Sequence, residues 1–202
     1  MASSVWGKGD EKTIALFKKH DLRGRWLNLA AGDGRYNLFL LQKADSVTVA
    51  DIDKRALNKL LRAAPEKYRS KLQLSAFDLT KRFPFDKHSF EGVFCTGALH
   101  LFQPEVLRKI VAEIHRVLKS GGSVIIDFAT DVRRVLPDGS LYFHDNEPRY
   151  DLHTADTLLR KLFKDYDLKI IRSRVSNENV NTGDLEYVFN CNFLLLNGKK
   201  KA

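Results

Sequence analysis

The sequence of 202 residues is poor in cysteine, proline and methionine, with two, five and one of each. Cys95 and Cys191 each stand in an apolar run, which suits a buried thiol in a reducing compartment better than a disulfide framework. No apolar run approaches the roughly 18 residues of a membrane-spanning helix, and the first residues lack the pattern of a signal peptide. Metal-ligand spacings are also absent. We therefore expect a soluble, cytoplasmic protein without a bound metal.

Acidic residues are outnumbered by basic ones, which gives a formal net charge of +9. The basic residues are spread along the chain and are not gathered in one arm. Scattered charge mostly serves solubility, but an acidic partner such as RNA or a phosphorylated small molecule is a second interpretation. The charge therefore leaves a nucleic-acid partner open without favouring it.

The length and the hydrophobic content of 44% suit a single domain with one core. Strand-like apolar runs alternate with segments whose apolar residues recur every three or four positions, as in amphipathic helices. The first five strand-like runs are residues 26–30, 46–50, 71–76, 92–96 and 123–128. Asp10 is expected to cap a helix before them, and Thr154 to cap a helix after them. This alternation predicts a doubly wound α/β fold with right-handed crossovers.

The last third of the chain departs from the alternation. Residues 168–175 and 185–196 have the pattern of two consecutive strands, and the polar segment 176–184 between them is expected to be a turn. Strands joined without a crossover helix run antiparallel. We therefore predict a seven-stranded sheet, with five or six parallel strands, a reversed seventh strand and helices on both faces.

The segment "AAGDGR", residues 30–35, follows the first strand. In a doubly wound sheet, ligands bind beyond the carboxyl ends of the strands, where small residues allow close approach to the backbone of the turn. Asp51 ends the second strand, a position at which a carboxylate accepts hydrogen bonds from both ribose hydroxyls. Asp53 is equally suited to be the N-cap of the next helix. The combination predicts nucleoside binding at this edge.

Several separate motifs resemble those of the class I, seven-stranded S-adenosylmethionine-dependent methyltransferases, over residues 26–196. "LNLAAGDGRYN" resembles the glycine-rich first motif of the family, and "VADID" resembles the segment with its ribose-binding acid. "SAFDL", "FPFDKHSFEGVFCTGALHLF" and "IVAEIHRVLKSGGSVII" are similar to the later motifs. The nearest resemblance is to the ubiquinone and menaquinone biosynthesis branch. It implies S-adenosyl-L-methionine as cofactor and S-adenosyl-L-homocysteine as product.

The resemblance also implies which residues bind the cofactor. They follow the first four strands and are Asn28, Ala30, Ala31, Gly32, Asp33, Gly34, Asp51, Ile52, Phe77, Asp78, Leu79, Cys95 and Thr96. Two of them depart from the family's pattern, because Asn28 replaces an acid and Ala30 replaces the first glycine. Asn28 offers no charge to an ammonium group, so a lower affinity for the cofactor is expected. Cys95 is interpreted as a core residue and not as a nucleophile.

Other functions for the same sheet are less well supported. A nicotinamide dehydrogenase would have a third glycine where this chain has Asn37. A regulatory subunit that binds the cofactor without activity of its own remains an alternative, as does methylation of RNA or protein. The first would bind cofactor without transferring a methyl group, and the second would label macromolecules.

Methyl transfer from a sulfonium requires alignment of the two reactants and, for a protonated nucleophile, removal of a proton. The segment 95–102 lacks the patterns of enzymes that methylate nucleic-acid bases, so we expect a small-molecule acceptor that is methylated at O, N, S or C. His100 follows the fourth strand, and the ordinary pKa of histidine suits a general base. It is the candidate catalytic residue, with a structural role as the alternative.

The segment 131–153 is far longer than the roughly 2–6 residues usual for such connections. Because it leaves the carboxyl end of the fifth strand, we predict a substrate lid, with a β-hairpin-like excursion on the sheet edge as the alternative. Its Tyr150 is expected to contact the acceptor. The N-terminal helical segment 1–24, with Trp6, is expected to close over the cofactor. Four basic residues of the lid are candidates for binding an anionic group of the acceptor: Arg133, Arg134, His144 and Arg149.

Overall fold

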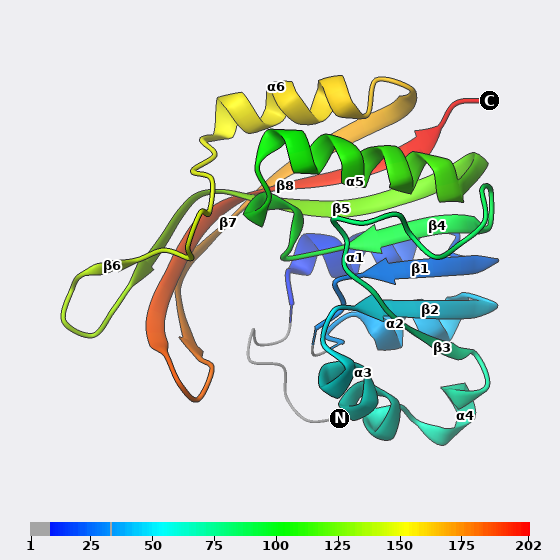
Figure 1. The fold of residues 1–202 in the computed structure, drawn as a ribbon, viewed down its shortest axis with the longest axis horizontal. Coiled ribbons are helices and arrows are strands. Elements are labelled where there is room, and N and C mark those ends of the chain that lie inside the picture. The colour runs from blue at the N-terminus through cyan, green and yellow to red at the C-terminus, as the bar shows by residue number, and fades with distance from the viewer. Residues whose placement is uncertain (1–8, 33) are drawn as a thin grey trace.

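The computed structural model describes residues 9–32 and 34–202. An eight-stranded sheet forms its centre, with the strand order β3-β2-β1-β4-β5-β8-β7 and with β6 paired to β5 alone (Figure 1). The strands are β1 (Arg25–Leu29), β2 (Ser46–Asp51), β3 (Leu72–Ala76), β4 (Phe90–Cys95), β5 (Leu118–Val135), β6 (Leu141–Tyr142), β7 (Tyr166–Asn181) and β8 (Glu186–Lys200). Strands β1 to β5 run parallel to one another, whereas β8 runs antiparallel to both β5 and β7. The predicted fold class is confirmed, and β8 is the reversed strand.

Three of the described helices begin after an aspartate whose side chain caps the first turn. The helices are α1 (Glu11–Lys19), α2 (Asn37–Lys43), α3 (Lys54–Ala63), α4 (Glu66–Arg69), η1 (Leu99–Leu101), α5 (Pro104–Val117) and α6 (Leu152–Leu162). Asp10 caps α1 and Asp53 caps α3, as expected. The expected cap of α6 is wrong, because Asp151 accepts hydrogen bonds from the N–H groups of His153 and Thr154. Within the described ranges, no helix combines the length and apolarity needed to cross a bilayer.

Two apolar layers cover the two faces of the sheet. Alternating residues of β4 and β5 point to opposite faces, so that Val93 and Cys95 pack with α5 and α6, whereas Phe94 packs with α1, α2 and α3. Figure 1 shows α5 and α6 on one side of the sheet and α1 and α2 on the other. This double covering explains why the central strands read as continuous apolar runs.

The fifth strand continues beyond the end that its sequence predicted. It runs to Val135, with an irregular register between Thr130 and Arg133, and then turns back into β6. The predicted loop is therefore wrong for residues 131–135. This part of the segment belongs instead to a β-hairpin, which was the alternative prediction. Asp131, Arg133 and Arg134 interrupt the apolar pattern, so the sequence did not predict a strand there.

The turn between β7 and β8 is likewise shorter than predicted, because β7 continues to Asn181. The predicted polar turn is therefore wrong over residues 176–181. Polar residues are tolerated there because β5, β7 and β8 extend past the other strands as a curved ribbon (Figure 1) with a small apolar cluster of its own, which includes Val180, Tyr187 and Phe189. We call this part the ribbon extension. It lies at the carboxyl edge of the parallel strands.

Candidate functional site

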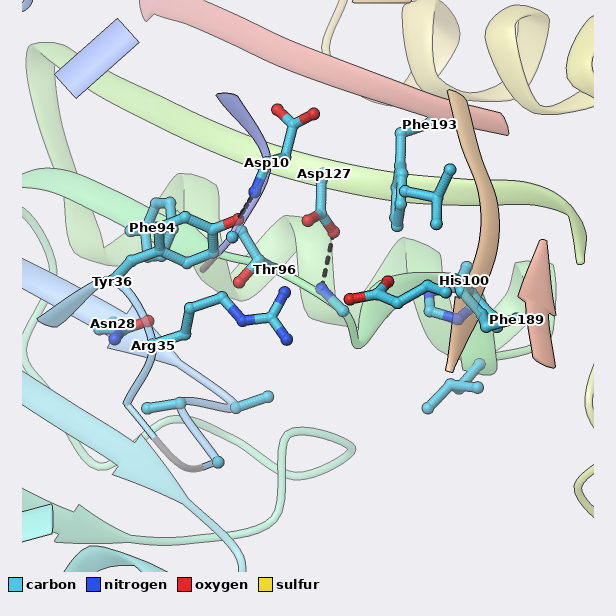
Figure 2. Close-up of a pocket in the computed structure, with 18 of the residues that line it drawn as sticks. Asp10, Asn28, Arg35, Tyr36, Phe94, Thr96, His100, Asp127, Phe189 and Phe193 are labelled. Carbon is cyan, nitrogen blue, oxygen red and sulfur yellow. Dashed lines mark hydrogen bonds between the residues drawn. The ribbon is translucent and has the colours of Figure 1, made fainter. Parts of the chain in front are cut away.

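A cavity of about 510 Å³ lies at the carboxyl edge of the sheet, between the turn after β1 and the ribbon extension. Its lining includes Asn28 from β1, Phe94 from β4, Asp127 from β5 and Phe189 from β8. Figure 2 shows Asn28, Arg35 and Tyr36 at one end of this cavity and His100, Phe189 and Phe193 at the other, with Asp127 between them. Its volume is within the range of about 300–1,000 Å³ typical of small-molecule sites.

The turn after β1 has an unusual backbone. Ala30, Gly32 and Gly34 all have positive φ angles, of 48°, 50° and 76°. This conformation is favourable for glycine and costs an alanine roughly 1–2 kcal/mol, which is a physical reason for the glycine usually found in place of Ala30. The turn is fastened to the next strand, because the Asp51 carboxylate accepts a hydrogen bond from the N–H of Gly32 at 2.8 Å.

Five of the predicted cofactor-binding residues line the cavity: Asn28, Ala30, Ala31, Gly32 and Thr96. Asn28 is buried, and its side-chain amide donates to Oδ1 of Asn37 at 2.5 Å. This bond ties β1 to the start of α2 and occupies an amide hydrogen of Asn28. Of the remaining predicted residues, Asp33 lies outside the described residues, as does Trp6.

The other predicted cofactor residues lie around the turn without lining the cavity. Gly34 is buried in the turn, and a Cβ there would meet Leu60 at 2.7 Å. Asp51 accepts a second hydrogen bond from the N–H of Asp53, at 2.9 Å. Ile52 beside it is 71% exposed, an unusual position for a large apolar side chain.

The predicted residues after β3 and β4 mostly face the core. The N–H of Phe77 donates to the carbonyl of Asp51, but its ring packs against other phenylalanines. Leu79 and Cys95 are buried, and burial raises the pKa of the Cys95 thiol, in line with the interpretation of Cys95 as a core residue. Asp78 remains partly exposed, and hydrogen bonds from Thr80 lower the pKa of its carboxyl group.

His100 lies in η1 and lines the cavity at the end opposite Asn28 and Arg35 (Figure 2). It is only 6% exposed, and its Nδ1 has no hydrogen-bond partner among the described residues. Burial lowers the pKa of His100 to about 4, so the ring is neutral at neutral pH. The expectation that its ordinary pKa would suit a general base is therefore wrong, and its place near an acceptor stays a prediction.

Asp127 is a cavity residue that the sequence did not reveal. It lies at the centre of the cavity in β5, and its carboxylate accepts a hydrogen bond from the N–H of Gly97 at 2.6 Å. Burial raises the pKa of Asp127 to about 7, and the charge of Asp10 adds to this effect. A carboxylate inside an apolar strand run was the available signal, since such a residue needs a partner or a function.

The N-terminal side of the cavity is formed by residues that sequence reasoning also missed. Tyr36 is buried, and its hydroxyl accepts a hydrogen bond from the N–H of Asp10 at 2.8 Å. Arg35 extends from the glycine turn into the cavity (Figure 2). These contacts bring the start of α1 against the glycine turn, and the closing of the N-terminal segment over a cofactor stays a prediction.

A buried ion pair holds the segment that follows β6 against β5. Arg134 donates two hydrogen bonds to the Glu147 carboxylate, at 2.8 and 3.0 Å, and both side chains are only 3% exposed. Burial alone would raise the pKa of Glu147, but the bonds from Arg134 and from the N–H of His144 lower it. The Tyr150 hydroxyl adds a bond to the carbonyl of Phe102 at 2.8 Å. The segment therefore has fixed anchors on both sides.

The four basic residues predicted to meet an anion have different surroundings. Arg134 and His144 line the cavity, but the charge of Arg134 is compensated by Glu147. Arg149 lies over the ring of Phe143 at 4.1 Å, and Arg133 is exposed. The cavity therefore has less free positive charge at this end than the sequence suggested.

Part of the sequence is similar to methyltransferases. Residues 27–122 match the family model described as a methyltransferase domain. An uncharacterized methyltransferase of Synechocystis is 33% identical over 96 residues, covering 48% of this chain and 42% of that protein. The glycine/sarcosine N-methyltransferase of Parasynechococcus marenigrum is 32% identical over 130 residues, covering 63% and 45%. The chain thus spans less than half the length of these two relatives.

Solved structures show the same fold over nearly the whole chain. The YcgJ protein of Bacillus subtilis has a TM-score of 0.69 at 16% identity, covering 96% of this chain and all of that chain. The 1,6-didemethyltoxoflavin-N1-methyltransferase of Burkholderia thailandensis, with bound 1,6-didemethyltoxoflavin and S-adenosylhomocysteine, has a TM-score of 0.62 at 18% identity, covering 95% and 78%. The resemblance to the class I methyltransferases is confirmed, and the fold is their Rossmann-like one. The finer resemblance to the ubiquinone branch stays a prediction.

The Arg134–Glu147 pair generates a stability prediction. Glu147→Gln should lower the free energy of unfolding by about 3 kcal/mol, because Arg134 would remain buried without a charge partner. Urea denaturation measures this. The control is Asp156→Asn, which removes the more exposed pair with Arg160 and should cost less than about 1 kcal/mol. Equal losses in the two variants would show that the buried pair does not hold the segment.

The raised pKa of Asp127 generates a pH prediction. Its folded pKa of about 7 lies above the ordinary 3.8, so its stabilising contribution is full below about pH 4 and is lost as the pH rises through 7. Asp127→Asn has no such loss. The difference in unfolding free energy between the variant and the wild type should therefore shift by roughly 2–3 kcal/mol in favour of the variant from about pH 5 to pH 8. Urea denaturation at each pH measures it. A difference that stays constant with pH would contradict the burial of this carboxyl group.

Proposed function

We propose that this chain, which has the class I methyltransferase fold, is an S-adenosylmethionine-dependent methyltransferase that methylates a small molecule at O, N, S or C. One observation carries the proposal: the glycine turn, held by Asp51, opens into a cavity whose far end is closed by the ribbon extension. In-line transfer requires a cofactor region and an acceptor region that adjoin in this way.

The residues around the glycine turn fit the nucleoside half of this cofactor. A Cβ at Gly32 would meet no atom within 4 Å, so the space beside the turn is open. Asp51 keeps lone pairs that can accept hydrogen bonds from ribose hydroxyls, and the exposed Ile52 would cover one face of adenine. Asp78 would hold the adenine edge, as the family resemblance implies. When bound, the cofactor supplies the electrophilic methyl group.

The acceptor end favours a small molecule. The segment after β6 is anchored by the buried Arg134–Glu147 pair and by a bond from Gln103 to the carbonyl of Asn146, so this segment forms a wall of the cavity. We keep residues 143–150 as the part of the proposed lid that selects the acceptor. The names of two similar proteins, which methylate glycine or sarcosine and 1,6-didemethyltoxoflavin, support a small acceptor.

His100 is proposed to orient the acceptor by a hydrogen bond. Its buried Nδ1 lacks a partner among the described residues, and a buried polar atom of this kind is costly unless something binds to it. The neutral ring is a weak base, so we assign it to alignment and not to proton removal. The proposal also includes a single methyltransferase domain, residues 1–202, in the cytoplasm, where the free thiols of Cys95 and Cys191 remain reduced.

The proposed function is tested by incubating the protein with methyl-tritiated S-adenosylmethionine and separate small-molecule, RNA and protein fractions of a cell extract. Label in the small-molecule fraction supports the proposal. Label in RNA or protein alone would favour the alternative that the basic charge keeps open. Tight cofactor binding without label in any fraction, together with a co-purifying partner chain, would favour a regulatory subunit.

Asp51 generates the cofactor prediction. Asp51→Ala should weaken S-adenosylhomocysteine binding by roughly 2–3 kcal/mol, because it removes charge-assisted hydrogen bonds to ribose and releases the glycine turn. Isothermal calorimetry measures the affinity. Asp51→Asn keeps an acceptor for the Gly32 N–H and should lose less. The matched control Asp53→Ala removes only the cap of α3, and an equal loss in that variant would contradict the assignment to Asp51.

His100 generates a kinetic prediction. His100→Ala should lower kcat/KM for the identified acceptor about tenfold, the value of one hydrogen bond, and leave the affinity for S-adenosylhomocysteine nearly unchanged. His100→Asn retains a polar group and should recover part of the loss. Steady-state kinetics and calorimetry separate the two effects. Loss of cofactor affinity in both variants would make His100 a cofactor contact, contrary to the proposal.

A further inference from the structure

The described cavity lining has more acidic than basic side chains among the aspartates, glutamates and arginines, whereas the whole chain has an excess of basic ones. Among the described lining residues, Asp10, Asp127 and Glu178 are acidic, while Arg35 and Arg134 are basic. Arg134 is compensated by Glu147 behind the wall. A chain with a net charge of +9 therefore encloses a cavity whose described lining contains more carboxyl groups than guanidinium groups.

Asp127 presents a carboxylate to the cavity. One oxygen accepts the bond from Gly97, and no further hydrogen bond to Asp127 is seen within residues 9–32 and 34–202. The second oxygen is not among the fully enclosed atoms without a partner, so it faces the cavity and not the core. It lies between the glycine-turn end and the aromatic end (Figure 2), where a methyl group and its acceptor would meet.

Glu178 extends the negative charge toward the ribbon extension. It stands on β7 and lines the cavity together with Phe189 and Phe193 of β8. In the described part of the chain its carboxylate has no hydrogen bond and no ion pair. Burial raises its pKa, and the charge of Arg35 counteracts this. The charges of Asp127 and Glu178 both raise the pKa of the Cys191 thiol, so the two carboxylates lie close to the same side chain.

An independent feature indicates a ligand at the same end. The Nδ1 atom of His100, a side chain more than nine-tenths buried, lines the cavity without a partner in the described residues. Since the ring is neutral at neutral pH, it does not repel a cation, and its unprotonated nitrogen can accept an N–H donor. Aromatic residues, carboxylates and a neutral imidazole together suit an amine with an apolar body.

We propose that the acceptor is an amine with an apolar or aromatic body, whose amino group binds the Asp127 carboxylate while Glu178 supplies a second negative charge. Asp127 is then the catalytic base of the reaction. The inference rests on the proposed methyltransferase function and specifies its acceptor.

The reaction balances with groups that the proposal names. The ammonium form of the acceptor gives one proton to the Asp127 carboxylate, which leaves a neutral amine. The nitrogen lone pair forms a bond to the methyl carbon, and the carbon–sulfur bond breaks with its electron pair remaining on sulfur. The products are the methylated ammonium and S-adenosylhomocysteine, and Asp127 then releases its proton to water.

The acceptor class is tested with methyl-tritiated S-adenosylmethionine and an extract whose small molecules are separated by ion exchange into cationic, neutral and anionic fractions. Label in the cationic fraction is expected. Label only in the neutral or anionic fraction overturns the inference and leaves the proposed function intact. Absence of label from every fraction, including RNA and protein, overturns both.

A binding panel tests the same point without turnover. With S-adenosylhomocysteine bound, calorimetry compares 2-phenylethylamine, 2-phenylethanol and 3-phenylpropanoate, which share a ring and differ in charge. The amine should bind at least about tenfold more tightly than the other two, and Glu178→Gln should reduce the difference because it removes the second negative charge. Asp138→Asn, an exposed acid in the turn between β5 and β6, is the matched control and should leave it intact. Equal affinities in the wild type overturn the inference.

The pH profile separates a base from a structural acid. Asp127 interacts electrostatically with five ionisable side chains: Asp10, Arg35, Tyr36, Cys95 and Cys191. The tyrosine and both thiols stay neutral, because burial raises their pKa values. For a labelled amine, kcat/KM should fall below about pH 7 as Asp127 is protonated. Asp127→Asn keeps an acceptor for Gly97 and should lose about a hundredfold in kcat/KM together with this acid limb. An unchanged limb in that variant overturns the role of Asp127.

Discussion

The antiparallel direction of β8 is the constraint on which the site depends. Strands β1 to β5 all end at one edge, so that edge alone would be an open groove. Because β8 runs in the opposite direction between β5 and β7, a short turn joins it to β7, and the three strands can extend beyond the edge without a crossover helix. Their backbone hydrogen bonds hold a wall in front of the groove. The cavity exists because this wall faces the glycine turn.

The fold was predictable because its signals are local. Apolar runs, helical periodicity and the acids at positions 10 and 53 each point to one element, and the absence of a helix before residue 185 predicted the reversed strand. The extension of β5 was not predictable, because its polar residues are satisfied by distant partners. Arg134 is an interior residue only because Glu147, thirteen positions later, returns to it. A sequence shows the charge of such a residue but not its partner.

The same distinction applies to the site. The glycine turn and Asp51 were predicted because the spacing along one β-α-β unit fixes their proximity, and the structure adds the bond between Asp51 and Gly32. Asp127, Tyr36 and Glu178 come together from three separate elements, so no spacing in the sequence links them. His100 lines the cavity, but its lowered pKa was not predictable from the sequence, because burial by residues distant in sequence determines it.

The two departures from the family's first motif have different physical consequences. Ala30 has a left-handed backbone, with a φ of 48°, so the cost of an alanine there is conformational, roughly 1–2 kcal/mol. Asn28 changes the charge, because its amide binds Asn37 and offers no anion. The cavity is nevertheless not short of negative charge, since Asp10 and Asp127 enter it from elements that the motif does not include. The motif alone therefore underestimates the negative charge of the site. The electrostatic potential in a cavity is the sum of contributions from all the residues around it, including those outside the motif.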